Sequence, residues 1–253
     1  MDVQLYAMTC GWLTVPLAGF LEGEEGRLAV PVPSYLIVHP RGRVLFDAGL
    51  HLDTQHDAAG YLGRAAKIFE IAFEPGEEIT ARLEAADTGV GEIDYVIASH
   101  LHFDHVGGLA QIPDARLVIQ SAEWAAGKEP DLIASNGYRP TDYDLGHGVL
   151  EVNGEHDLFG DGSVVIVPTH GHTPGHQSLK VRLGSGDVIL AGDACYLRRT
   201  LEDMHLPRTL HDREAMLESL RHLKRLERQG ARIFYGHDPE FWKAVPQAPL
   251  AVA

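Results

Sequence analysis

Four side chains that can bind metal ions lie within one short stretch, His100-Leu101-His102-Phe103-Asp104-His105. In an extended segment, residues i, i+2 and i+4 point to the same side, so His100, His102 and Asp104 could face one cavity. His105 joins them if the chain turns at Phe103 and Asp104, as the glycines that follow would allow. Imidazoles and a carboxylate suit a borderline divalent ion such as Zn²⁺, and four ligands this close together can serve two ions. The motif therefore predicts a metal centre.

Three further candidate ligands stand just after expected strands. His172 follows the strand VVIVP, Asp193 follows VILA, and His237 follows RIFY. Taken alone, each would be an ordinary loop residue. Because all of these segments follow strands, their loops are expected to converge along one edge of the sheets and to complete the metal centre.

The elements that must position these residues alternate between strands and helices. A hairpin is expected at residues 34–39 and 43–49, where Pro40 and Gly42 supply the turn. Helices are expected at 61–73, 75–86, 106–112, 121–128 and 212–228, with a long irregular loop at 129–148. The other strands are expected at 3–8, 93–99, 115–120, 163–169, 177–183, 187–193 and 232–236. This order predicts an α/β (α+β) fold, a four-layer αββα sandwich of two mixed sheets with outer helices.

The composition is that of a soluble globular protein, since 45% of the 253 residues are hydrophobic and 23% are charged. No stretch rich in Ser, Gly or Pro offers a linker, so we expect one domain over residues 1–253. The formal charge of −15 argues against nucleic acid as a partner. Cys10 and Cys195 match no disulfide framework, and the sequence has neither an export signal nor an 18-residue apolar run. A cytoplasmic protein without membrane contact is expected.

Five motifs between residues 46 and 238 carry a resemblance to a known family. They are Phe46-Asp47-Ala48-Gly49, Ser99-His100-Leu101-His102-Phe103-Asp104-His105-Val106-Gly107-Gly108, Gly171-His172-Thr173-Pro174-Gly175-His176-Gln177-Ser178-Leu179, Asp193-Ala194-Cys195-Tyr196 and Phe234-Tyr235-Gly236-His237-Asp238. With these motifs the chain resembles the metallo-β-lactamase superfamily, and most closely its N-acyl homoserine lactonases. The resemblance implies the αββα metallo-β-lactamase fold and a metal-dependent hydrolase.

The resemblance also implies two divalent metal ions, for which Zn is expected while Fe, Co and Mn stay open. It assigns His100, His102 and His172 to one ion, Asp104, His105 and His237 to the other, and Asp193 to a bridge between them. Such ions lower the pKa of a bound water to about 7, which yields a hydroxide nucleophile at neutral pH. The implied reaction is ring opening of an N-acyl homoserine lactone by a bridging hydroxide, the reaction of a quorum-quenching lactonase.

Two residues are implied in the chemistry itself. Tyr196 stands where the lactonases place a tyrosine hydroxyl beside the substrate carbonyl, and a preorganised donor there is worth about 3 kcal/mol. Asp104 would carry a proton to the leaving alkoxide, which requires it to be freed from full coordination during turnover. Asp47 is expected to hold ligand loops by hydrogen bonds, and His176 is considered for the same role.

Apolar side chains would meet the acyl chain of the substrate. The candidates are Met8, Trp12, Phe20, Phe69, Phe73, Phe103, Tyr138 and Tyr143. For Phe69 and Phe73, four residues apart in an expected helix, a stripe facing the core is the stronger interpretation. The expected partner is thus a small acyl lactone, and a homodimer is left open.

Other members of the superfamily are alternatives. Class B β-lactamases are disfavoured because they use a cysteine where Asp193 stands. Glyoxalase-II-type thioester hydrolases share the two-metal ligand set, but they normally add a C-terminal helical region, and 16 residues follow His237. Nucleases would want a basic groove. A phosphodiesterase, another lactonase, or a non-hydrolytic di-iron redox module remains as an alternative.

Overall fold

The computed structural model describes residues 3–253, so Met1 and Asp2 of the expected domain lie outside the described residues. Within that range, the first sheet contains β1 (Gln4–Pro16), β2 (Arg27–His39), β3 (Gly42–Phe46), β4 (Glu70–Ala72), β5 (Ile93–Ile97), β6 (Arg116–Gln120) and β7 (Val149–Val152). Their spatial order is β4-β1-β2-β3-β5-β6-β7. Strands β1 to β3 pair antiparallel, whereas β3, β5, β6 and β7 pair parallel, so the sheet is mixed.

The second sheet is smaller and comes from the C-terminal half of the chain. It contains β8 (His156–Asp157), β9 (Val164–Pro168), β10 (Gln177–Leu183), β11 (Gly186–Leu190) and β12 (Arg232–Phe234). The order is β12-β11-β10-β9-β8, and only the β11–β12 pair of these described strands is parallel. Both sheets are therefore mixed, as the sequence predicted.

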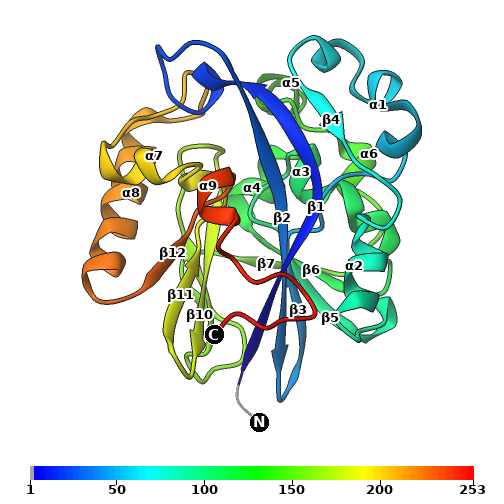
Figure 1. Cartoon of the computed structure of the whole chain (residues 1–253), viewed down its shortest axis with the longest axis vertical. Coiled ribbons are helices and arrows are strands. Elements are labelled where there is room, and N and C mark those ends of the chain that lie inside the picture. The colour runs from blue at the N-terminus through cyan, green and yellow to red at the C-terminus, as the bar shows by residue number, and fades with distance from the viewer. Residues whose placement is uncertain (1–2) are drawn as a thin grey trace.

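Helices cover the outer faces of the two sheets. They are α1 (Thr54–Leu62), α2 (Ile79–Ala85), α3 (Phe103–Val106), α4 (Ser121–Ala126), α5 (Pro130–Asn136), α6 (Pro140–Tyr143), α7 (Arg198–Glu202), α8 (Arg213–Arg228) and α9 (Pro239–Trp242). In Figure 1, α7 and α8 lie outside the side formed by β10 to β12, whereas α1, α2 and α6 lie outside the opposite side. Within residues 3–253, no helix is both long enough and apolar enough to cross a membrane.

The side chains of a strand alternate between two apolar layers, because successive residues of a strand point to opposite faces. Val118 of β6 belongs to the cluster between the two sheets, whereas Leu117 and Ile119 belong to the cluster beneath the helices. In β11, Val188 and Ile189 divide in the same way. Both faces of each central strand are thus buried, and the predicted αββα sandwich is confirmed.

Two expected elements are wrong. The helix expected at residues 61–73 ends instead at Leu62, a 3-10 turn (Gly63–Lys67) follows, and β4 begins at Glu70. Gly63 ends α1 with a φ of 56°, a value that favours glycine, so Phe69 and Phe73 do not share a helix.

The loop expected at residues 129–148 holds two short helices, α5 and α6. Pro130 and Pro140 each occupy a first helical position, where a missing N–H group is no loss. The sequence analysis also missed β7 and β8, which are short and add to the outer ends of the two sheets.

Candidate metal centre

Three histidines point ring nitrogens at one another. We call His100, His102 and His172, together with Asp193, the first ligand group. His100 Nε2 lies 2.8 Å from His102 Nδ1, and His172 Nε2 lies 3.2 Å and 3.0 Å from these two atoms. All four residues offer a ligand atom within 4.8 Å of the others. His100 follows β5 and His172 follows β9, so the two sheets contribute to one group.

The opposite ring nitrogens of these three histidines are also engaged. The Asn136 carbonyl oxygen can only accept, so His102 Nε2 carries the ring proton and His102 Nδ1 keeps its lone pair. The Ser99 hydroxyl donates to Asp47, so it can accept from His100 Nδ1 and leave the lone pair on His100 Nε2. This leaves inward lone pairs that no single proton can satisfy, which is the arrangement of a cation site. The outer partners are the Ser99 hydroxyl for His100, the Asn136 carbonyl for His102 and the Tyr196 hydroxyl for His172, at 2.9, 2.7 and 2.8 Å.

Asp104, His105 and His237 form the second ligand group. Asp104 Oδ2 lies 3.6 Å from His105 Nε2 and 3.7 Å from His237 Nε2. The far nitrogens are again held: His105 Nδ1 lies 2.8 Å from an Asp47 oxygen, and His237 Nδ1 donates to the Pro31 carbonyl at 2.8 Å. Both rings therefore turn Nε2 toward Asp104.

Asp193 lies between the two groups and offers one oxygen to each. Its Oδ1 lies 3.0 Å from His237 Nε2 and 3.3 Å from His105 Nε2. Its Oδ2 lies 3.4 Å from His172 Nε2 and 3.8 Å from His100 Nε2. A carboxylate in this position can bridge two cations.

Two buried polar atoms in the described chain test whether cations fit. Neither His105 Nε2 nor Asp193 Oδ1 has a hydrogen-bond partner within residues 3–253. An unsatisfied buried polar group costs about 1–3 kcal/mol, which a bound cation would remove at both atoms. Imidazole and carboxylate donors are those of zinc-like ions. The residues thus fit a pair of divalent ions.

Burial and charge set the protonation states of these groups. Burial lowers the pKa of His100 and of His172 well below the ordinary histidine value, so both rings stay neutral. Burial alone would raise the pKa of Asp193, but His105 and His237 hold it well below its usual range. Burial would lower the pKa of His105, yet Asp193 leads the carboxylates that raise it well above the ordinary value. The second ligand group therefore favours positive charge.

Asp47 ties the ligand loop to the end of β3. It accepts hydrogen bonds from the Ser99 backbone N–H at 2.7 Å and the Ser99 hydroxyl at 2.9 Å, besides its contact with His105. His176 lies on the other side of the centre, where its Nε2 accepts from the Asp193 N–H at 3.0 Å. Both residues thus hold ligands through hydrogen bonds from buried positions.

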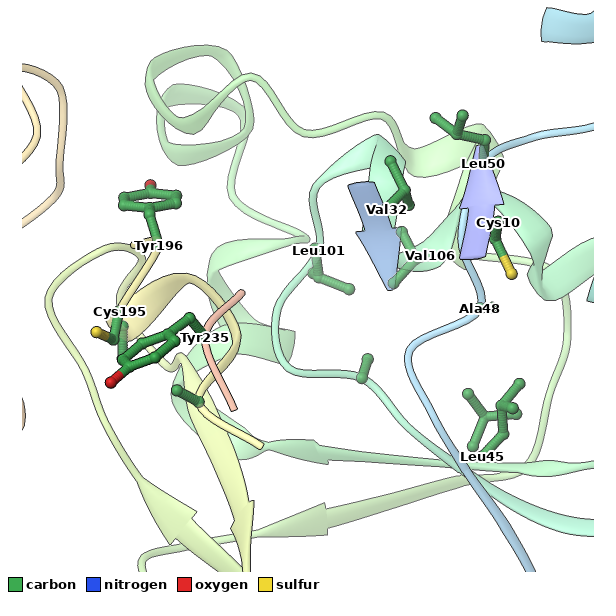
Figure 2. Close-up of a cluster of buried hydrophobic side chains, with 14 of the residues drawn as sticks. Cys10, Val32, Leu45, Ala48, Leu50, Leu101, Val106, Cys195, Tyr196 and Tyr235 are labelled. Carbon is green, nitrogen blue, oxygen red and sulfur yellow. The ribbon is translucent and has the colours of Figure 1, made fainter. Parts of the chain in front are cut away.

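The structure places Tyr196 beside the first ligand group. Its hydroxyl contacts His172, and its side chain is buried with 3% exposure. Burial raises its pKa well above the ordinary value, so the phenol keeps its proton. Figure 2 shows that the sulfur of the neighbouring Cys195 points away from the Tyr196 ring, and it lies 3.5 Å from the Leu197 carbonyl oxygen. Burial raises the pKa of Cys195 as well, which leaves an unreactive thiol.

Some of the apolar candidates lie near the ligands. Phe20 stacks on Tyr196 with ring centroids 4.3 Å apart, and on His237 at 5.5 Å. Phe103 and Phe69 are half-buried and meet edge to face at 5.5 Å. These three rings surround the loops that carry the ligands.

The other apolar candidates pack elsewhere. Met8, Phe73 and Tyr143 lie within the buried core, and the Tyr143 hydroxyl donates to the Gly127 carbonyl. Trp12 is half-buried against the cluster between the sheets. Tyr138 lies 5.6 Å from the His102 ring, but its hydroxyl donates to Glu123.

Sequence reasoning missed Glu123 and the backbone carbonyls that orient His102 and His237. Glu123 is fully buried in α4 and accepts hydrogen bonds from two ligand loops. The sequence signal was weak, because an acid in the first turn of a helix is ordinarily a solvated residue near the positive end of the dipole. Carbonyl partners carry no sequence signal, since every residue has one.

Comparison with known proteins agrees with this geometry. A model of the metallo-beta-lactamase superfamily matches residues 27–237. The chain therefore belongs to the metallo-beta-lactamase superfamily, which confirms the resemblance seen in its motifs. Within the superfamily it is similar to the N-acyl homoserine lactonase AttM of Azorhizobium caulinodans, with 32% identity over 98% of each protein. An N-acyl homoserine lactonase of Bacillus cereus is 31% identical over 84% of this chain and 83% of that protein.

Solved structures show the same fold. One is an N-acyl homoserine lactone hydrolase with the product N-hexanoyl-L-homoserine bound at the catalytic metal centre. It is 26% identical, covers 100% of both chains, and superposes with a TM-score of 0.89. AidC, a dizinc quorum-quenching lactonase, shares the fold at 17% identity and a TM-score of 0.70, over 94% of this chain and 88% of that one.

Proposed function

We propose that this protein is a metal-dependent hydrolase that opens the lactone ring of N-acyl homoserine lactones. The observation that carries the proposal is the Tyr196 hydroxyl, which lies 2.8 Å from a histidine of the first ligand group. It places a protonated phenol at the edge of a centre that can hold two ions. The names of the most similar relatives support the same substrate class.

The proposed cofactors are two divalent ions, with zinc as the first choice and iron, cobalt or manganese as the others. His100, His102 and His172 would hold one ion, Asp104, His105 and His237 the other, and Asp193 would bridge them. When bound, two such ions lower the pKa of a water molecule to about 7 and polarise a carbonyl oxygen. The neutral rings of His100 and His172 and the ionised Asp193 are ready for this role.

Two residues of the chain supply proton and hydrogen-bond chemistry in this proposal. Tyr196 donates its hydroxyl proton in a hydrogen bond to the lactone carbonyl oxygen as negative charge develops there. Asp104 takes up the proton that the attacking hydroxide gives up and passes it to the ring oxygen as the bond between the carbonyl carbon and that oxygen breaks. Tyr196 contacts the first ligand group and Asp104 belongs to the second, so the two residues act from opposite sides of Asp193.

The acyl chain is proposed to lie against the aromatic rings near the ligands. Phe20 covers the ring of Tyr196, and Phe69 packs against Phe103 next to His102. These rings offer apolar surface for an acyl chain, whereas the lactone end needs the polar centre. Met8, Phe73, Tyr138 and Tyr143 belong to the same apolar cluster as Phe20 and would support this surface from the core, whereas Trp12 packs against the cluster between the sheets.

Residues 1–253 are proposed to act as one domain on a small acyl lactone, with no nucleic acid or membrane partner and with a homodimer left open. A cytoplasmic location is proposed because Cys10 and Cys195, both buried, are free thiols. Light scattering of the purified protein would give the oligomeric state.

The proposal is tested by rates on a substrate panel with metal-replete protein. The panel contains N-acyl homoserine lactones, plain γ- and δ-lactones, a glutathione thioester and a phosphodiester. We expect acyl homoserine lactones to exceed the thioester and the phosphodiester by at least about tenfold in kcat/KM, or about 1.4 kcal/mol of transition-state binding. Faster turnover of the thioester or the phosphodiester would contradict the proposal.

A further inference from the structure

We propose that Glu123 is a positioning residue that sets the spacing of the first ligand group. This inference rests on the metal centre proposed above. Glu123 belongs to α4, carries no ligand atom of either group, and is fully buried. Its carboxylate links the two separate loops that bring His100, His102 and His172 together.

The contacts of Glu123 reach both loops at once. Glu123 Oε1 accepts from the Leu101 N–H at 3.1 Å, and Leu101 stands between His100 and His102. Glu123 Oε2 accepts from the Gly175 N–H at 2.8 Å, three residues after His172. One rigid carboxylate therefore fixes the distance between the two loop backbones.

A third contact connects Glu123 with the segment between α5 and α6. The Tyr138 hydroxyl donates to Oε1 at 2.7 Å, and Tyr138 lies between α5 and α6. All three partners are donors, so both carboxylate oxygens are needed as acceptors. An amide in this place would turn a donor toward at least one of them.

The backbone fits the same role independently of these hydrogen bonds. A Cβ atom added to Gly175 would lie 2.2 Å from the Glu123 backbone nitrogen and 2.6 Å from the Glu123 Cβ. The loop that carries His172 is thus pressed against the first turn of α4, where only glycine fits. Helix α4 acts as a platform for this loop.

The second ligand group is held by other residues. His105 is oriented by Asp47, and His237 is oriented by the Pro31 carbonyl. Neither Asp47 nor Pro31 is among the hydrogen-bond partners of Glu123. A defect at Glu123 should therefore weaken one ion of the pair more than the other. A general loss of folding would weaken both.

The test is the metal affinity of Glu123→Gln, measured by zinc titration against a competing chelator. The glutamine oxygen can still serve Leu101 and Tyr138, but its amide group then faces the Gly175 N–H. We expect one of two zinc ions to bind about 10- to 100-fold more weakly, the range seen when a partner that orients metal ligands is removed. The other ion should keep its affinity.

Two variants separate positioning from general damage. Tyr138→Phe removes a donor to Glu123 but leaves both loop contacts, so it should keep two tightly bound ions. Gly175→Ala displaces the same loop from α4 while Glu123 stays intact, so it should lose affinity at the same single ion. If Glu123→Gln fails to fold, Gly175→Ala provides the test.

Unchanged affinity for both ions in a folded Glu123→Gln protein would overturn the proposal, as would equal weakening of both. The proposal would also be overturned if Tyr138→Phe lost as much zinc affinity as Glu123→Gln. These readouts use no substrate. If the wild-type protein binds two ions but hydrolyses no lactone, the proposed function is refuted. The zinc titration of the Glu123 variants would still test the role of Glu123.

Discussion

The hydroxyl oxygen of Tyr196 lies 2.8 Å from Nδ1 of His172. His172 Nε2 faces the two other histidines of the first ligand group, so an ion bound there would take its lone pair, and the ring proton would then lie on Nδ1 and point at Tyr196. The tyrosine oxygen then accepts, and its own proton is free for another acceptor. The Tyr196 hydroxyl can thus accept from His172 and still keep a proton to donate.

Replacing Tyr196 by Phe should lower kcat on lactones by about 100-fold, as the loss of one oxyanion donor usually does. The His172 Nδ1–H loses its acceptor, but the ring remains packed. Kinetics and metal analysis of the same preparation check this prediction. Turnover equal to wild type with both ions present would remove Tyr196 from the mechanism.

Replacing Asp47 by Asn should weaken the second ligand group. Asparagine tolerates the left-handed backbone at this position, where φ is 59°. Its amide group, however, would face the His105 Nδ1–H or the Ser99 donors, and an unmatched buried donor costs about 1–3 kcal/mol. Urea unfolding and zinc titration measure both effects.

Ser34→Ala is the matched control for Asp47. The Ser34 hydroxyl donates to the Asp47 backbone carbonyl at 2.7 Å, so this change touches the same residue without reaching His105. It should lower stability by about 1 kcal/mol and leave zinc affinity unchanged. Equal zinc affinity in Asp47→Asn and wild type would show that Asp47 does not orient His105.

Removing the metal should lower both activity and stability. An ion that binds only the folded state stabilises it by about 4 kcal/mol at a concentration a thousandfold above Kd. Chelation should therefore lower Tm, and added zinc or cobalt should restore both Tm and lactone turnover. His237→Ala should reduce the metal-dependent shift in Tm, whereas His222→Ala, on α8 and in neither ligand group, should keep it. A Tm that does not respond to metal would contradict the two-ion centre.

The stability of the protein should fall between pH 9 and pH 12 in a way that depends on Cys10. Burial in the core raises the pKa of Cys10 from 9.0 to about 12. The unfolded chain then releases this proton near pH 9 while the folded chain holds it, so the unfolding free energy decreases as pH rises through that window. Figure 2 shows Cys10 beside Leu50, on the opposite side of the view from Tyr196.

Cys10→Ala lacks this proton, so its unfolding free energy should fall less steeply with pH than that of the wild type. The difference between the two slopes should be at most about 1.4 kcal/mol per pH unit. Urea unfolding of both proteins at several pH values above 9 measures the two slopes. Parallel slopes would mean that the Cys10 thiol titrates alike in the folded and unfolded states.

The fold class and the candidate metal ligands could both be predicted from the sequence. Apolar runs that end in His or Asp predict strands with polar loops at their ends, and this pattern is local. The helix α8 follows from the same kind of signal, since Met216, Leu220 and Leu223 recur at helical spacing and Asp212 caps its start. Local periodicity and capping need no knowledge of distant residues.

The hydrogen bonds that hold the candidate ligands could not be predicted from the sequence. Pro31 and His237 are 206 residues apart, and Glu123 reaches Gly175 across 52 residues, so no local pattern could pair them. The same applies to β4, which forms where the sequence favoured a helix because β1 offers it an edge to pair with. Hydrogen bonds between distant segments exist only once the sheets have packed, and these bonds orient the side chains that the motifs supply.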